Sequence, residues 1–210
     1  MDKTTVDTYD QLATAYDQET TNFWNRFPRG VIDTFIESIR YKKVLDVGSG
    51  PGRDGLIIAQ RGLDVTCLDA SAVMVDLCKK NGLKSVLGDF NQLPFDDGEF
   101  GGVWAYTSLL HVPKAHVHRA LREIKRVLRP DGVFGLGMIE GDTEGYRPSS
   151  GATTARWFSY YSEEELRSLL AAHGFAVTHF EQFTPGPRNY LNFISIKSRT
   201  SLGDGTPNNF

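Results

Sequence analysis

The sequence is poor in cysteine and contains no long apolar run. Its two cysteines, Cys67 and Cys78, match no metal-binding spacing, and a pair in 210 residues makes no disulfide framework. We interpret both as small buried hydrophobic residues. The longest apolar runs fall well short of the about 18 residues that a membrane-spanning helix needs. We therefore expect no metal centre and no membrane span.

Positive charge is not in excess either. The formal net charge is −3, whereas a protein that binds nucleic acid or an anionic membrane needs clustered lysine and arginine. The first residues, MDKTTVDTYDQL, lack the basic and apolar regions of a secretory signal. These absences predict a cytoplasmic protein with neither nucleic-acid nor membrane partners.

What is present is an alternation of short apolar runs and amphipathic segments from Lys42 onward. A length of 210 residues fits one domain. Strands separated by helices indicate right-handed βαβ crossovers and a parallel sheet covered on both faces. The runs expected as strands are KVLDVG, DVTCLD, KSVLGD, FGGVWAYT and VFGLGMI.

The last third departs from that rhythm. Residues 140–157 are polar and rich in glycine, which predicts a loop over one end of the sheet. Ser162 and Glu165 then have the spacing of a capping box at the start of a helix. The segments FAVTHFEQF and YLNFISIKS, joined by TPGPRN, read as two strands of an antiparallel hairpin.

The stretch VLDVGSGPGRDG, residues 44–55, combines an apolar run, an acid and four glycines. Such glycines let backbone N–H groups approach a ligand, and the N-terminus of the following helix favours negative charge. Read from Gly50, the spacing is the G-x-G-x-x-G of a dinucleotide site; read from Asp46, it is D-x-G-x-G-x-G. The glycines alone do not separate these two cofactor classes.

Two acids add information. Asp69 ends the second predicted strand, where either kind of site places an acid that binds ribose hydroxyls. Asp46 precedes Gly48 directly, so its carboxylate would repel a pyrophosphate and suits a ligand with an ammonium group, such as S-adenosylmethionine. The alternative for Asp46 is a structural role, capping the helix or satisfying loop amides.

Four segments together resemble the successive motifs of class I S-adenosylmethionine-dependent methyltransferases, in particular the small-molecule branch that includes ubiquinone- and menaquinone-biosynthesis homologues. The resemblance runs from about residue 9 to residue 197. It implies a Rossmann-like, seven-stranded, mostly parallel sheet with helices on both faces and an antiparallel last strand. The four segments are VLDVGSGPG, CLDAS, GDFNQLPFDDGEFGGVWAYTSLLHV and ALREIKRVLRPDGVFGLGM.

The resemblance also implies a reaction and a set of cofactor contacts. A methyl group would pass by direct in-line displacement from S-adenosylmethionine to an O, N, S or C nucleophile of a small molecule, leaving S-adenosylhomocysteine. Met74 is equally well explained as a core residue, and Asp89 as a turn residue. The cofactor-binding residues that the resemblance implies are Tyr16, Asp46, Gly48, Gly50, Gly52, Asp69, Ala70, Ser71, Met74, Asp89, Phe90 and Ala105.

The run Ala105-Tyr106-Thr107-Ser108 ends the fourth predicted strand, where the family's transfer site lies. DNA and glutamine N-methyltransferases carry an Asn- or Asp-Pro-Pro-Tyr run here, so methylation of bases or glutamine amides is disfavoured. Tyr106 and His111 are the expected catalytic residues, because an imidazole titrates near neutral pH and can take a proton. The alternative is that His111 packs against the sheet, since an activated donor needs in-line placement more than a base.

The resemblance assigns residues 1–41 to a helical lid, 42–198 to the methyltransferase core and 199–210 to a flexible tail, all within one domain. Trp24 is also explained by ordinary packing, and Arg156 and Tyr160 are further candidates for acceptor contact. We expect a small-molecule acceptor and a monomer or homodimer. The residues expected to bind the acceptor are Tyr9, Trp24, Arg29, Arg147 and Trp157.

Two rival hypotheses remain at this point. An NAD(P)-dependent Rossmann oxidoreductase would use the glycines and Asp69, but it leaves Asp46, Asp89 and the terminal hairpin without a role. A catalytically silent S-adenosylmethionine-binding protein would keep the cofactor residues without turnover.

Overall fold

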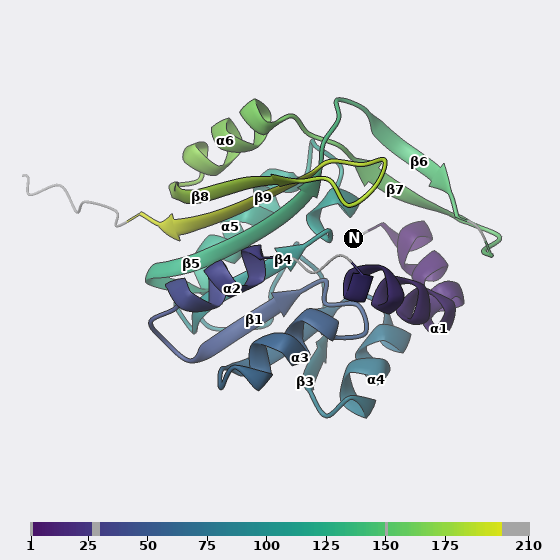
Figure 1. Cartoon of the computed structure of the whole chain (residues 1–210), viewed down its shortest axis with the longest axis horizontal. Helices are drawn as coiled ribbons and strands as arrows, with labels where there is room; N and C mark the ends of the chain where they lie inside the picture. Colours follow the sequence, from purple (N-terminus) through teal and green to yellow (C-terminus); the bar gives the residue numbers. More distant parts are fainter. Residues whose placement is uncertain (1, 27–29, 150, 199–210) are drawn as a thin grey trace, which may run out of the picture.

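Seven strands form one sheet in the order β3-β2-β1-β4-β5-β9-β8, and two more form a separate hairpin (Figure 1). The computed structural model describes residues 2–26, 30–149 and 151–198. The sheet strands are β1 (Lys43–Val47), β2 (Asp64–Asp69), β3 (Lys84–Leu87), β4 (Phe100–Tyr106), β5 (Leu128–Ile139), β8 (Phe175–Phe183) and β9 (Tyr190–Lys197).

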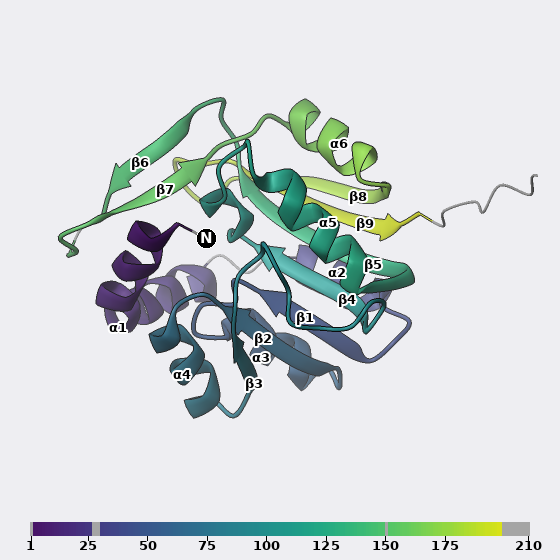
Figure 2. The same cartoon turned by 180° about the vertical axis from the view of Figure 1, so that it is seen from behind.

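Helices cover both faces of this sheet: α2 and α3 lie in front of it in Figure 1, and α5 lies in front in Figure 2. None of the described helices has the length and apolar character needed to cross a bilayer. The helices are α1 (Lys3–Arg26), α2 (Val31–Ser38), α3 (Arg53–Gln60), α4 (Ala72–Lys80), the short 3-10 helix η1 (Leu109–His111), α5 (Val117–Val127) and α6 (Glu163–Ala172).

The apolar runs become strands because their side chains alternate between two cores. Along β1, Val44 belongs to the cluster under α2 and α3, whereas Leu45 and Val47 belong to the cluster under α5 and α6. All three side chains have no exposed surface. A strand buried on both faces needs a continuous apolar run, which is what residues 44–47 supply except at Asp46.

The closing strands confirm the expected antiparallel end of the sheet. β9 runs antiparallel to β5, with Met138 opposite Leu191, and antiparallel to β8, with Phe180 opposite Phe193. The predicted caps are also present: Ser162 and Glu165 form the capping box of α6, and the Ser71 side chain accepts from the Met74 N–H at the start of α4. The mostly parallel, seven-stranded fold expected from the sequence is therefore confirmed.

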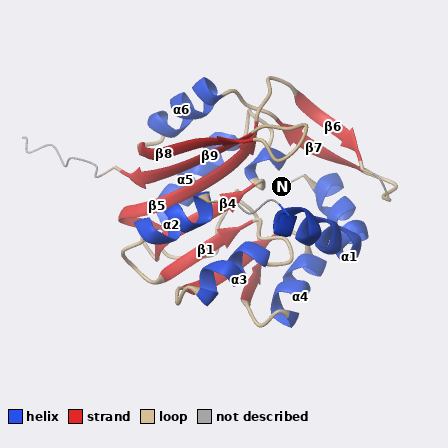
Figure 3. Ribbon diagram, viewed as in Figure 1, coloured by secondary structure: helices blue, strands red, loops and turns tan. Residues whose placement is uncertain are grey.

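The prediction of a loop over residues 140–157 is wrong at residues 144–148 and 155–157, which lie in two strands. β6 (Glu144–Pro148) pairs antiparallel with β7 (Ala155–Ser159), and Figure 3 shows this hairpin beside α1. The composition did not predict the hairpin, because strand formation here depends on cross-strand packing rather than on an apolar run. Tyr146 lies opposite Trp157, with the ring centroids 5.2 Å apart.

α1 is docked against the hairpin and against α4 at the carboxyl ends of β1 and β4 (Figures 1 and 2). The Thr8 hydroxyl lies 2.6 Å from the Thr154 hydroxyl and donates to the Ala155 carbonyl at 3.0 Å. The Trp157 N–H donates to the Thr5 hydroxyl at 2.9 Å. α2 packs differently from α1, because the buried residues of α2 belong to the hydrophobic core on one face of the sheet. Arg29 and the segment 199–210 lie outside the described residues.

Candidate active site

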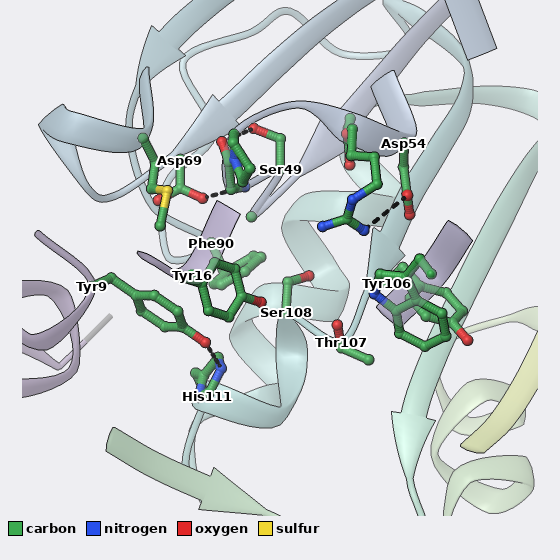
Figure 4. A pocket seen from close by; sticks show the side chains of 17 residues that line it. Tyr9, Tyr16, Ser49, Asp54, Asp69, Phe90, Tyr106, Thr107, Ser108 and His111 are labelled. Atoms are coloured by element: carbon green, nitrogen blue, oxygen red, sulfur yellow. Dashed lines mark hydrogen bonds and ion pairs between the residues drawn. The ribbon is translucent and has the colours of Figure 1, made fainter. Parts of the chain in front are cut away.

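The carboxyl ends of β1, β2 and β4 meet at one sheet edge, where open α/β sheets bind their ligands. A cavity of about 680 Å³ lies there, beneath α1 (Figure 4). The cavity is lined by Tyr9, Tyr16, Trp24, Asp46, Gly48, Ser49, Gly50, Pro51, Arg53, Asp54, Asp69, Met74, Phe90, Tyr106, Thr107, Ser108 and His111.

The glycine turn between β1 and α3 is packed tightly on one side and open on the other. Gly48 has φ +67° and Gly52 has φ +87°, a region that residues with a side chain rarely adopt. A Cβ at Gly48 would collide with Ser108, and one at Gly52 would lie 2.6 Å from Leu83. At Gly50, by contrast, the nearest atom to such a Cβ is in the Tyr16 ring at 4.0 Å. The backbone is therefore bare toward the cavity at Gly50.

Asp69 ties the glycine turn to the start of α4. Its carboxylate accepts from the Gly50 N–H at 2.8 Å and from the Ser71 N–H at 2.9 Å. Burial raises the pKa of Asp69 to about 6, although these N–H groups act in the opposite direction. The side chain is consequently an anion at neutral pH, in contact with the cavity.

Asp46 is buried in the cavity wall, with 2% of its surface exposed. Among the described residues, none donates a hydrogen bond to its Oδ2 atom. Burial, and then the nearby charge of Asp54, raises the pKa of Asp46 well above its ordinary value. A buried carboxyl oxygen without a partner is costly, and a cationic group entering the cavity would supply that partner.

His111 is held on both ring nitrogens, as Figure 4 shows for one of them. Nδ1 lies 2.6 Å from the Trp157 carbonyl oxygen, and Nε2 lies 2.7 Å from the Tyr9 hydroxyl. A carbonyl only accepts, so Nδ1 carries the hydrogen and Nε2 accepts from Tyr9. Burial lowers the pKa of His111 to about 3, and the positive charge of Arg156 acts in the same direction. The imidazole is therefore neutral at pH 7.

A second cavity, of about 920 Å³, adjoins the first and shares the wall formed by Tyr9, Tyr16, Trp24, Thr107 and His111. Its other lining residues come from α1, the sheet edge and the hairpin. They are Glu19, Thr20, Phe23, Leu110, Ile139, Arg156, Phe158, Arg188 and Tyr190.

Thr107 occupies the shared wall in a strained conformation. Its φ is +51°, and only Asp131 among the other described residues with a side chain also has a positive φ. A β-branched residue in this region is an outlier, and such strain is concentrated at functional sites. The Thr107 N–H donates to the Gly137 carbonyl at 2.8 Å, which fixes the turn after β4.

The comparisons with known proteins agree with this geometry. Residues 45–136 match the protein family described as a methyltransferase domain. This match and the methyltransferases among the similar proteins confirm the resemblance to class I S-adenosylmethionine-dependent methyltransferases. The O-methyltransferase resE of Aspergillus sclerotiorum is 28% identical over 181 residues, which cover 80% of this chain and 68% of that protein.

The sterol methyltransferases among the relatives match over less of their own length. Sterol 24-C-methyltransferase ERG6B of Gibberella zeae is 38% identical over 105 residues, 45% of this chain and 27% of that enzyme. The chain thus spans about a quarter of that relative in the match.

Solved methyltransferase structures share the fold. The 1,6-didemethyltoxoflavin-N1-methyltransferase of Burkholderia thailandensis, crystallised with S-adenosylhomocysteine, has a TM-score of 0.70 at 22% identity, covering 92% of this chain and 88% of that one. The DhpI complex with S-adenosylhomocysteine has a TM-score of 0.77 at 18% identity, covering 94% and 97%.

The first cavity fits the cofactor of this methyltransferase family, S-adenosylmethionine, on chemical grounds. Its wall offers the unpartnered Oδ2 atom of Asp46 to a ligand ammonium group, and the turn at Gly50 leaves room for a ligand to approach the backbone. Asp69 adds an anionic acceptor for hydroxyl groups. A pyrophosphate would bring its negative charges against both acids.

The structure brings eleven of the residues expected at the site into the wall of the first cavity. Ala105 is instead buried in the core, Ser71 caps α4, and Gly52 lies beneath the turn. Ala70 and Asp89 lie beside the cavity lining. The eleven are Tyr9, Tyr16, Trp24, Asp46, Gly48, Gly50, Asp69, Met74, Phe90, Tyr106 and His111.

Two expected acceptor contacts lie elsewhere. The Arg147 side chain is exposed on β6 and donates to the Thr143 hydroxyl at 3.3 Å. Trp157 lies behind His111 and contributes its backbone carbonyl rather than its ring.

Sequence reasoning assigned no role to Arg53 and Asp54, which follow the glycine turn in the first turn of α3. The Trp104 indole N–H donates to Asp54 at 2.9 Å, which holds this acid at the cavity wall near Asp46. The signal was present, because the first turn of a helix after a glycine-rich loop faces the ligand. Ser49 and Pro51 line the cavity from the glycine turn itself, and Ser108 lines it after β4, in the run where the transfer site was expected.

Proposed function

We propose that this methyltransferase moves the methyl group of S-adenosylmethionine to a small molecule that binds in the second cavity. The observation that carries the proposal is the shared wall, which puts a cavity lined by the glycine turn and three acids beside a second, largely aromatic one. Relatives named for methylation of a sterol carbon, of a ring nitrogen and of oxygen support a small-molecule acceptor.

The residues that would hold the cofactor come from three strand ends. Asp46 would pair with its ammonium group, the bare turn at Gly50 would lie against its methionine end, and Asp69 would accept from its ribose hydroxyls. Met74 and Phe90, both buried in the cavity wall, would pack against the adenine ring. Asp89 stays a candidate for the adenine amino group.

The bound cofactor supplies a methyl group that is already activated by positively charged sulfur. The chain's own residues then have to position the nucleophile and keep water out. Tyr9 and Tyr16 line the shared wall from α1, and Thr107 lines it from the end of β4. His111 orients the Tyr9 hydroxyl through its Nε2 atom.

We infer that α1 serves as the lid of this site, because it contributes Tyr9, Tyr16 and Trp24 to both cavities. The cytoplasmic location, the monomeric or dimeric state and the assignment of Tyr106 and His111 as catalytic residues stay predictions from the sequence.

Calorimetric titration with S-adenosylhomocysteine and with NAD(H) tests the proposal first. We expect binding of S-adenosylhomocysteine and none of NAD(H); the reverse pattern would support the oxidoreductase hypothesis. Mass spectrometry then follows S-adenosylhomocysteine formation across a panel of phenols, carboxylic acids, amines and thiols. Binding without turnover across that panel would favour the catalytically silent alternative.

A further inference from the structure

The second cavity combines aromatic walls with a partly buried guanidinium. Phe158 and Tyr190 face it from the hairpin and from β9, and Phe23 and Trp24 face it from α1. Trp24 packs edge-on against Tyr190, with ring centroids 5.4 Å apart. Arg156 projects from β7 into this aromatic surround. Such walls favour a planar, apolar ligand body.

Neutral groups hold Arg156 in place. Its Nε donates to the Ser149 hydroxyl at 2.9 Å, and its Nη1 donates to the Tyr9 hydroxyl at 3.2 Å. The guanidinium lies 5.1 Å from the Tyr9 ring centroid and 5.3 Å from that of Phe158. Within the described part of the chain, Arg156 forms no ion pair with a carboxylate. Its planar fork is thus oriented while its charge is not neutralised.

The other charges of this cavity do not cancel that of Arg156. Arg188 and Glu19, both exposed, line it as well, and Arg188 lies 3.5 Å from the Tyr160 hydroxyl. One carboxylate thus faces two guanidinium groups, and the cavity is positive overall. The neutral state of His111 agrees with this field, because Arg156 opposes its protonation.

We infer that the acceptor is a planar aromatic carboxylate whose carboxylate group pairs with Arg156 while its ring packs against the aromatic wall formed by Phe23, Trp24 and Tyr190. This inference rests on the proposed function and names the substrate class for the second cavity. A guanidinium matches a carboxylate with two parallel hydrogen bonds, and the surrounding rings exclude water from the pair. Arg156 is thereby the residue that determines specificity for the acceptor.

The test compares two probes of the same shape, 2-naphthoate and its neutral counterpart 2-naphthamide. Each is titrated by calorimetry into the protein with and without saturating S-adenosylhomocysteine. We expect naphthoate to bind at least about ten-fold more tightly, the range of a charge-assisted pair. Arg156→Gln should abolish that preference, and Arg156→Lys should retain part of it, because charge remains but the planar fork is lost.

Controls keep the two proposals apart. Arg122→Gln, on the exposed side of α5, removes an equal charge outside the cavity and should leave the preference intact. S-adenosylhomocysteine affinity should be the same in all four proteins, since Arg156 does not line the first cavity. Equal affinities for the two probes, no binding of either, or a preference that survives Arg156→Gln would overturn the inference. Absence of S-adenosylhomocysteine binding beside an intact preference would instead overturn the proposed function.

Discussion

The two cavities have opposite charge. The first is lined by Asp46, Asp54 and Asp69 with one cation, Arg53, whereas the second is lined by Arg156 and Arg188 with one anion, Glu19. A cationic sulfonium ligand suits the first, and an anionic ligand suits the second. Under the proposed function, this sheet edge would sort the two ligands by charge before any specific contact is made.

The two regions also differ in how they are assembled. The first is built from turns that directly follow β1, β2 and β4, so its parts are fixed by the core sheet. The second is built where α1 meets the hairpin, through contacts such as Thr8 with Thr154 that join distant parts of the sequence. Changes in one region should therefore leave the other largely intact, and four substitutions test this.

The largest effect is expected from Gly52→Ala in the first region. The new Cβ would lie 2.6 Å from Leu83 and 2.9 Å from Cys78, at φ +87°. We expect a loss of about 2–4 kcal/mol in the free energy of unfolding, from backbone strain and overpacking together. Chemical denaturation measures it. Gly82→Ala is the matched control, because its φ is +81° but nothing lies within 4 Å; equal losses in both variants would refute the packing argument.

Asp69→Asn should weaken cofactor binding and leave binding in the second cavity unchanged. Loss of a charged acceptor should weaken S-adenosylhomocysteine binding at least about ten-fold at pH 7.5. Because the pKa of Asp69 is about 6 and binding needs the ionised form, wild-type affinity should fall as the pH drops below 6. The variant should lack this contribution to the pH dependence.

Calorimetry from pH 5 to pH 8 measures both effects, with naphthoate binding as the internal control. Asp76→Asn, on the exposed face of α4, is a matched control that should change the affinity for neither ligand. A wild-type affinity that stays constant below pH 6 would contradict the role assigned to Asp69.

Tyr9→Phe tests the wall between the regions. It leaves the buried Nε2 of His111 without its donor, which should cost about 1–2 kcal/mol in the free energy of unfolding. Tyr146→Phe removes a hydroxyl that bonds exposed Asp2 at 3.0 Å and should cost less than about 0.5 kcal/mol. Thermal and chemical denaturation distinguish the two. A negligible cost for Tyr9→Phe would mean that this hydrogen bond does not fix the imidazole.

Thr107→Asn should give the smallest change in the free energy of unfolding, and it should raise that free energy rather than lower it. Asparagine tolerates a φ of +51° better than a β-branched residue does, so we expect stability to rise by about 1 kcal/mol. Naphthoate and cofactor affinities should both shift slightly, because Thr107 lines both cavities. A drop in the unfolding midpoint would show that the threonine side chain stabilises this turn by more than its backbone strain costs.

The sequence allowed prediction of the first region because its signals are local. Asp46, the glycine turn and Asp69 each stand directly at a strand end, and apolar runs mark those strands. The second region needed tertiary information. No periodicity in residues 144–159 predicts β6 and β7. These strands form because Tyr146 packs against Trp157 and the Ser159 hydroxyl donates to the Val112 carbonyl.

The charge state of His111 was equally out of reach. An imidazole that titrates near pH 7 was the sequence-based expectation, but burial beside Arg156 lowers its pKa to about 3. That neighbour is supplied by β7, 45 residues further along the chain, and only the docked hairpin reveals it.

α1 carries a consequence for kinetics. The same helix walls both compartments and is fastened to its surroundings by hydrogen bonds from Thr5, Thr8 and Ser71. If α1 is the lid that we propose, its movement would uncover both ligands at once, so ligand entry or release at one cavity would affect the other. A single helix that covers both sites favours an ordered mechanism, in which substrates bind and products leave in a fixed sequence, over a random one.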